Sequence, residues 1–146
     1  MPPPAANTAR ELLGVTTLLM RSFAARMRQG DQRLEPAHIG ILAKVSLGAC
    51  SLTELAQHQS VRLPTMSKSV SLLVERGWLA RAIPAANRRQ AIVTLTAEGR
   101  RMFAGMRRDA EKHVAQLLAA LDRAERVQVD KGLAILIRVL SAAVRN

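Results

Sequence analysis

Aromatic residues and cysteine are scarce in this sequence, and each shortage excludes a class of site. The 146 residues include two phenylalanines, one tryptophan and no tyrosine, too few for the stacking platforms that bind single-stranded nucleic acids. The single Cys50 cannot form an intramolecular disulfide or a cysteine-based zinc site within one chain. His38, His58 and His113 also lack the spacing of metal ligands. We therefore expect neither a metal site nor a cofactor.

Long apolar runs and targeting signals are missing as well. No stretch approaches the roughly 18 consecutive apolar residues of a membrane span, and residues 1–15 lack the basic flank and apolar run of a signal peptide. Residues 1–7 contain three prolines, which block early helix formation, so a disordered lead is expected there. The predicted location is the cytoplasm.

Catalytic patterns are equally absent from the sequence. It shows no nucleophile–base pair, no carboxylate pair, no phosphate-binding loop and no metal cluster. The sequence therefore predicts a protein that is not an enzyme.

Positive charge is abundant and unevenly distributed. The formal net charge is +11, which favours a polyanionic partner such as DNA, RNA or an anionic membrane surface. Between Arg62 and Arg89, six basic residues stand against Glu75 alone. A merely solubilising surface does not need such a concentration. Together with the shortage of aromatic residues, it favours duplex DNA.

Apolar periodicity predicts a mainly α-helical chain. A first helix is expected from about Thr8 to Gln29, and a second from Pro36 to Gly48. Two long helices are expected after Thr96, one to about Leu121 and one from Arg123 to about Arg145. Thr96 and Asp122 are the expected caps of these last two helices.

The segment from Leu52 to Thr96 contains the pattern of a helix-turn-helix followed by a β-wing. Ser51 and Glu54 form a capping box for a short helix that ends near His58. Residues 59–62 have the length of a helix-turn-helix turn. Pro64 then opens a reader helix that ends near Arg76, with Gly77 as the residue that stops it.

Two short strands are expected after the reader helix, at 79–84 and 90–95, around a basic tip. Arg88 and Arg89 at this tip suit the minor groove, where narrow A·T-rich sequences have a negative potential that attracts arginine. A solvated turn is the competing interpretation of these two residues.

The reader helix has an apolar face and a polar face at 100° per residue. The expected core face consists of Met66, Val70, Leu73 and Val74. The opposite face suits the major groove, where small hydroxyl groups allow close approach and a lysine reaches a phosphate or a guanine. A solvated helix surface is the alternative. The residues expected to face DNA are Arg62, Pro64, Thr65, Ser67, Lys68 and Ser71.

These motifs together resemble the MarR family of winged-helix regulators (multiple-antibiotic-resistance regulators). The stretch LTELAQHQSVRLPTMSKSVSLLVERGWLARAIPAANRRQAIVTLTAEG carries the resemblance. It implies a two-fold dimer that binds a palindromic operator. The leading hypothesis for the function is a dimeric repressor or, less often, an activator that binds duplex DNA. It also implies that small ligands, often aromatic acids, weaken DNA binding.

Two positions depart from the family pattern. The family usually has aspartate where Asn87 stands, and this acid commonly braces the wing arginine that Arg89 matches. Asn87 offers a hydrogen bond without charge. The turn commonly carries glycine where Ser60 stands, although a non-glycine residue adopts a left-handed conformation at modest cost.

The helices at both ends of the chain carry more apolar surface than a small reading domain covers. We expect residues 8–34 and 97–146 to form a helical dimerisation region, and residues 35–96 to form the winged helix-turn-helix domain. An all-helical monomer core is the alternative. The apolar stripe of the last helix comprises Val129, Leu133, Leu136, Ile137, Leu140 and Val144.

The sequence contains few features that indicate a binding site for a small effector. Adaptable methionines and a group that pairs with a carboxylate would suit it, although methionines more often belong to a core. The candidates are Met20, Arg21, His38, Met102 and Met106.

Two alternative functions remain open. Cys50 could make the protein a redox-sensing regulator, although a lone buried thiol is the simpler interpretation. A winged helix can also serve as a protein–protein interaction module without DNA binding.

Overall fold

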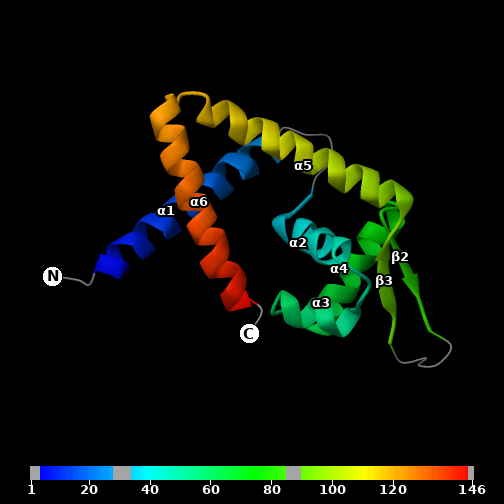
Figure 1. Cartoon of the computed structure of the whole chain (residues 1–146). Helices are drawn as coiled ribbons and strands as arrows, with labels where there is room; N and C mark the ends of the chain where they lie inside the picture. The colour runs from blue at the N-terminus through cyan, green and yellow to red at the C-terminus, as the bar shows by residue number, and fades with distance from the viewer. Residues whose placement is uncertain (1–3, 28–33, 85–89, 145–146) are drawn as a thin grey trace. The chain divides into compact units, whose positions relative to one another are not determined.

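The computed structural model describes residues 4–27, 34–84 and 90–144. They form six helices and a small antiparallel sheet (Figure 1). The helices are α1 (Pro4–Met27), α2 (Pro36–Ser46), α3 (Leu52–His58), α4 (Leu63–Glu75), α5 (Ala97–Leu118) and α6 (Arg123–Val144). The strands are β1 (Cys50–Ser51), β2 (Leu79–Ala82) and β3 (Ile92–Leu95). The expected fold class, mainly α with a winged helix-turn-helix, is confirmed.

The sheet has three strands in the order β1-β3-β2, all antiparallel. Leu79 pairs with Leu95 and Arg81 with Val93, while Cys50 pairs with Val93 from the other side. The sequence predicted β2 and β3 but missed β1, because two residues are too few to show any period.

Helix α1 begins at Pro4 and not near Thr8. The expected irregular lead over residues 1–7 is therefore wrong for residues 4–7. Proline is tolerated in the first turn of a helix, because the N–H that it lacks has no partner there.

The chain divides into two compact units, and the division falls within α5 after Gly105. In the first unit, α4 contacts both α2 and α3, and each of the three helices contacts a strand of the sheet. The fully buried side chains are Ile41, Leu42, Leu55, Met66, Val70, Leu73, Leu79 and Val93. This core holds α4 against the sheet with its other face exposed.

The second unit contains the end of α5 and all of α6, joined by a short turn. The Glu125 N–H donates to Asp122 Oδ1 at 2.9 Å, and the Asp122 N–H donates to Glu125 Oε2 at 3.0 Å. The predicted cap of α6 by Asp122 is thus confirmed as a reciprocal capping box.

Candidate nucleic-acid interface

Local hydrogen bonds fix the start of α3 and the turn between α3 and α4. Ser51 Oγ accepts from the Glu54 N–H at 3.1 Å, and Glu54 Oε2 accepts from the Ser51 N–H at 2.7 Å. Ser60 has a φ of 54°, so this serine adopts the left-handed conformation that glycine usually takes. The Val61 N–H then donates to the Ala56 carbonyl at 3.0 Å. These contacts confirm the predicted capping box and helix-turn-helix.

The buried side of α4 anchors the helix in the first unit. Met66, Val70 and Leu73 are at most 1% exposed, as their spacing predicted. Val74, the fourth residue of the expected core face, is only partly buried, because it lies at the edge of that face. Gly77 ends the helix with a φ of +77°.

The other side of α4 carries the predicted reader residues. Arg62 caps the helix through its backbone alone, since its side chain makes no capping bond, and it is exposed. Pro64, Thr65 and Lys68 are exposed too, whereas Ser67 and Ser71 are half-buried. These six residues therefore lie at the N-cap of α4 or on the side of α4 away from its buried residues.

Sequence reasoning missed one residue of this surface, Arg81 on β2. Its Nη2 donates to the Ser67 carbonyl oxygen at 3.2 Å and to Ser71 Oγ at 3.4 Å. The charge count included this arginine, but nothing in the sequence indicated that β2 lies beside α4. We use the term reader surface for seven residues: Arg62, Pro64, Thr65, Ser67, Lys68, Ser71 and Arg81.

The reader surface keeps its positive charge available. Among the described residues, one ion pair is closer than 4 Å. It joins Arg107 to Glu111 on α5, and both side chains are highly exposed. Arg76 near the end of α4 lies over the Trp78 ring at 5.2 Å. Arg62, Lys68 and Arg81 therefore form no ion pair within 4 Å with a described carboxylate.

The predicted tip of the wing comprises three residues. Asn87, Arg88 and Arg89 lie outside the described residues. Their predicted contact with the minor groove stays a prediction.

The five effector candidates are in dissimilar surroundings. Met20 is 57% exposed and Arg21 is exposed on α1. His38 is buried, and its Nδ1 accepts from the Glu35 N–H at 3.2 Å, which secures the start of α2. Met102 and Met106 are half-buried on α5. His38 thus has a structural hydrogen bond that does not require a ligand.

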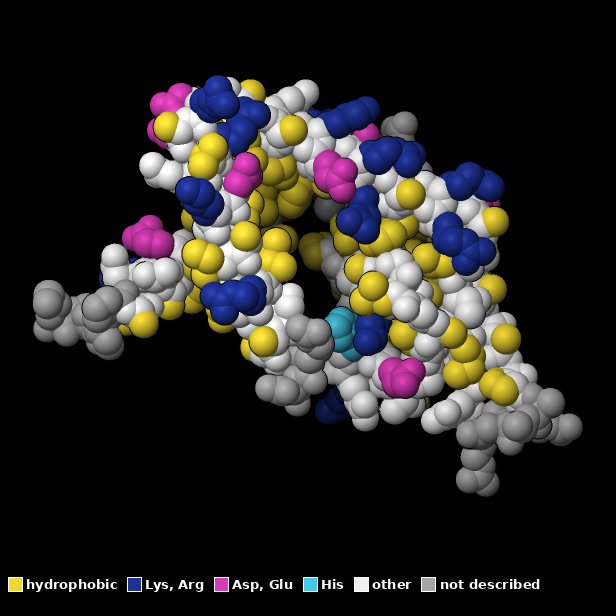
Figure 2. All heavy atoms as spheres, in the orientation of Figure 1, with side chains coloured by type: hydrophobic (Ala, Val, Ile, Leu, Met, Phe, Trp, Pro, Cys, Tyr) yellow, Lys and Arg dark blue, Asp and Glu magenta, His cyan; other side chains and the backbone are white. Residues whose placement is uncertain are grey.

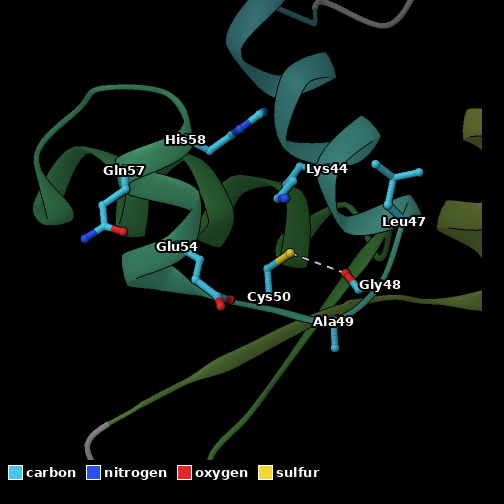
Figure 3. A pocket seen from close by; sticks show the side chains of 8 residues that line it. All are labelled: Lys44, Leu47, Gly48, Ala49, Cys50, Glu54, Gln57 and His58. Atoms are coloured by element: carbon cyan, nitrogen blue, oxygen red, sulfur yellow. Dashed lines mark hydrogen bonds between the residues drawn. The ribbon is translucent and has the colours of Figure 1, made fainter. Parts of the chain in front are cut away.

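A hollow of about 530 Å³ opens beside Cys50, between the end of α2 and α3 (Figure 3). None of the effector candidates lines it. Its lining mixes charged and small residues: Lys44, Leu47, Gly48, Ala49, Cys50, Glu54, Gln57 and His58. The described residues contain no cluster of His, Cys, Asp and Glu that could hold a metal ion. No helix among them is long and apolar enough to cross a bilayer.

Cys50 itself is buried, and its Sγ lies 3.3 Å from the Gly48 carbonyl oxygen. Burial raises the pKa of the thiol, and the nearby positive charge of Lys44 opposes this only in part. We expect Cys50 to react with iodoacetamide at pH 8 more slowly than free cysteine, because the raised pKa of the thiol leaves less thiolate. Mass spectrometry of timed samples measures the rate, with urea-unfolded protein as the control. A rate equal to that of free cysteine would support a thiol switch.

Known proteins resemble this chain in part of its sequence and in its fold. No family model matches the sequence. An uncharacterized HTH-type transcriptional regulator of Mycobacterium bovis is 32% identical over 79 residues. The match covers 54% of this chain and 55% of the relative, so the chain spans about half the length of the curated relatives it matches.

Solved structures match over nearly the whole chain. A MarR family protein from Bacillus stearothermophilus superposes with a TM-score of 0.76 at 16% identity, covering 94% of this chain and 95% of that one. The chain has the fold of the MarR family. The fold that the MarR resemblance of residues 52–99 implies is thereby confirmed, and α3 and α4 are the helix-turn-helix of this fold.

Two further solved structures of similar fold belong to proteins that bind DNA. FabT from Streptococcus pneumoniae, solved in complex with DNA, has a TM-score of 0.68 at 17% identity, covering 95% of this chain and 99% of FabT. BpsR from Bordetella bronchiseptica, whose DNA binding is regulated by 6-hydroxynicotinic acid, has a TM-score of 0.61 at 27% identity. That match covers 90% of this chain and 98% of BpsR.

Proposed function

We propose that this protein is a cytoplasmic, dimeric transcription regulator that binds duplex DNA through the reader surface. In this proposal it represses from a palindromic operator, and a small ligand, such as an aromatic acid, relieves the repression. The observation that carries the proposal is the polar, positively charged and exposed side of α4, held rigidly by a buried apolar side.

The chemistry of this surface suits the major groove. Thr65, Ser67 and Ser71 have short side chains that allow a helix to approach base edges closely. Lys68 supplies a cation in the middle of α4, and the N-terminus of the helix adds N–H donors for phosphate. The DNA complex of the structurally similar FabT supports this use of the fold.

The exposed apolar side chains of α6 support the dimer. Ile137 is 65% exposed and Leu140 is 50% exposed, and Figure 2 shows hydrophobic side chains along this helix. Surfaces of this kind usually bind a partner, and a second copy related by a two-fold axis is the most common one. A dimer would set two reader helices about 34 Å apart, one turn of DNA.

The regulation of BpsR by 6-hydroxynicotinic acid supports a small aromatic acid as the effector. Of the five candidates, Arg21 offers an exposed cation to a carboxylate. Titration of the DNA complex with a panel of aromatic acids tests this part of the proposal. Release of the DNA by none of them would remove it.

Lys68 gives the sharpest test of the reader surface. We expect Lys68→Ala to weaken binding to a duplex selected from a random library by about 1–3 kcal/mol, and to weaken binding to random duplex less, if Lys68 contacts a base. Fluorescence anisotropy at fixed salt measures both affinities. Equal losses on the two duplexes would make Lys68 a phosphate contact.

The matched control is Lys112→Ala on α5, which removes the same charge from an exposed position outside the reader surface. We expect this variant to bind the selected duplex like the parent protein. A Lys68 variant indistinguishable from this control on both duplexes would contradict the role of α4. Binding of a protein partner through α4, without any DNA binding, would favour the interaction-module alternative.

A further inference from the structure

Arg81 joins the first wing strand to the reader helix. Its Nη2 donates to the Ser67 carbonyl oxygen at 3.2 Å and to Ser71 Oγ at 3.4 Å. The two acceptors lie one helical turn apart on α4. They hold one nitrogen of the guanidinium against the half-buried serines of the reader surface.

The sheet explains how Arg81 reaches this position. Side chains alternate along a strand, so Arg81 leaves β2 on the same side as the buried Leu79, two residues earlier. Strand β2 is an edge strand in contact with α4. The aliphatic part of an arginine can cover apolar surface while its guanidinium reaches solvent, and the Arg81 side chain is exposed.

The guanidinium retains donors for another partner. An arginine has five N–H donors, and the Nη2 nitrogen accounts for two of them. Within the described parts of the chain, no carboxylate pairs with Arg81, and Nε and Nη1 donate to no residue. Such a guanidinium, with Nη2 hydrogen-bonded to α4 and with Nε and Nη1 still able to donate, suits a phosphate group.

The position of Arg81 determines which part of a bound DNA duplex it would contact. If α4 enters the major groove and the wing enters the adjacent minor groove, one sugar–phosphate strand must pass between them. Arg81 spans the junction between α4 and β2 where this strand would run. We propose that Arg81 clamps a backbone phosphate of the strand that separates the two grooves, with Ser67 and Ser71 fixing its orientation. The inference rests on the proposed function.

Arg81→Gln tests the clamp, because glutamine removes the charge and keeps a polar side chain. Loss of one phosphate contact lowers the magnitude of the slope of log K against log salt by about 0.9 per half-site. At ~0.15 M salt the same loss weakens binding about five-fold per contact. We expect both effects, equally on selected and random duplexes, since a phosphate contact carries no sequence information.

Three comparisons separate the clamp from a purely structural brace. Arg81→Lys keeps the charge and should keep the salt slope, whereas Ser71→Ala removes one acceptor and should lower affinity less than Arg81→Gln. Arg123→Gln, an exposed charge-matched control on α6, should leave the slope unchanged. Thermal unfolding midpoints confirm that each variant is folded.

The experiment distinguishes failure of the Arg81 clamp from failure of the proposed function. A parent protein that binds no duplex at low salt overturns both the proposed function and the clamp. A parent protein that binds duplex, with an Arg81→Gln variant of unchanged salt slope, overturns the clamp alone. Loss of slope in Arg81→Lys equal to that in Arg81→Gln would also overturn it, because the lysine still carries the charge.

Discussion

Replacing Ile137 by glutamate is expected to separate the proposed dimer and abolish tight binding to a two-half-site duplex. Ile137 lies on α6 and is 65% exposed in the single chain. In a two-fold interface the substitution occurs twice, and each buried carboxylate would lack a partner. At about 2 kcal/mol for each copy of a central interface residue, dimerisation weakens about 1,000-fold. Sedimentation equilibrium measures this change directly.

The matched control is Gln128→Glu, which adds the same negative charge to the same helix. Position 128 lies nine residues before Ile137, which places it on the opposite side of α6, and Gln128 is exposed. We expect this variant to stay dimeric and bind DNA like the parent protein. Dimers of unchanged stability in Ile137→Glu would exclude this side of α6 from the interface.

Replacing Gly99 by alanine is expected to destabilise the fold by about 3 kcal/mol. Gly99 lies in the first turn of α5, where its N–H donates to Thr96 Oγ1 at 2.9 Å. A Cβ at this position would overlap the carbonyl group of Trp78. That carbonyl is backbone and accepts from the Thr96 N–H at 3.0 Å, so it cannot move aside without breaking the junction between the wing and α5.

Gly132→Ala on α6 provides the control, because a Cβ there meets no atom within 4 Å. Alanine in a helix interior is favoured over glycine, so this variant should be more stable by about 0.5–1 kcal/mol. Urea unfolding of both variants at one protein concentration measures the difference, since the stability of a dimer depends on concentration. Equal stability of Gly99→Ala and the parent protein would contradict the close packing at Trp78.

Local hydrogen-bonding patterns explain why so much of the winged helix could be predicted. Ser51 with Glu54 and Asp122 with Glu125 are reciprocal capping boxes within four residues of sequence, so the sequence alone specifies their partners. The buried side of α4 follows from the helical period. Here the local propensity and the tertiary packing agree.

Contacts between distant segments could not be predicted in the same way. The contact from Arg81 to Ser67 and Ser71 joins residues 10 to 14 positions apart, and its formation depends on how β2 packs against α4. Strand β1 is defined only by its pairing with β3. Such features have no periodic signal in the sequence.

The effector site remains a prediction for a related reason. The imidazole of His38 is of a type that can pair with a carboxylate, yet its Nδ1 accepts a backbone N–H at the start of α2. A residue type alone does not distinguish a ligand contact from a helix-capping contact. The hollow beside Cys50 is lined by residues from α2, β1 and α3 that no sequence motif grouped together.

The salt dependence of duplex binding tests the central claim most directly. Arg62 and Arg81 on each protomer of a dimer offer four cations to phosphate groups, and Lys68 offers two more if it contacts a phosphate and not a base. At about 0.9 per phosphate, the slope of log K against log salt should lie between about −3.6 and about −5.4. Anisotropy titrations between ~50 mM and ~300 mM salt would measure it, with the parent protein and an Arg62/Lys68/Arg81 triple-alanine variant side by side. A slope at least this steep in the parent protein, and a much shallower slope in the triple variant, is the predicted result. Absence of duplex binding at the lowest salt, or a slope that the triple variant retains, would contradict the account.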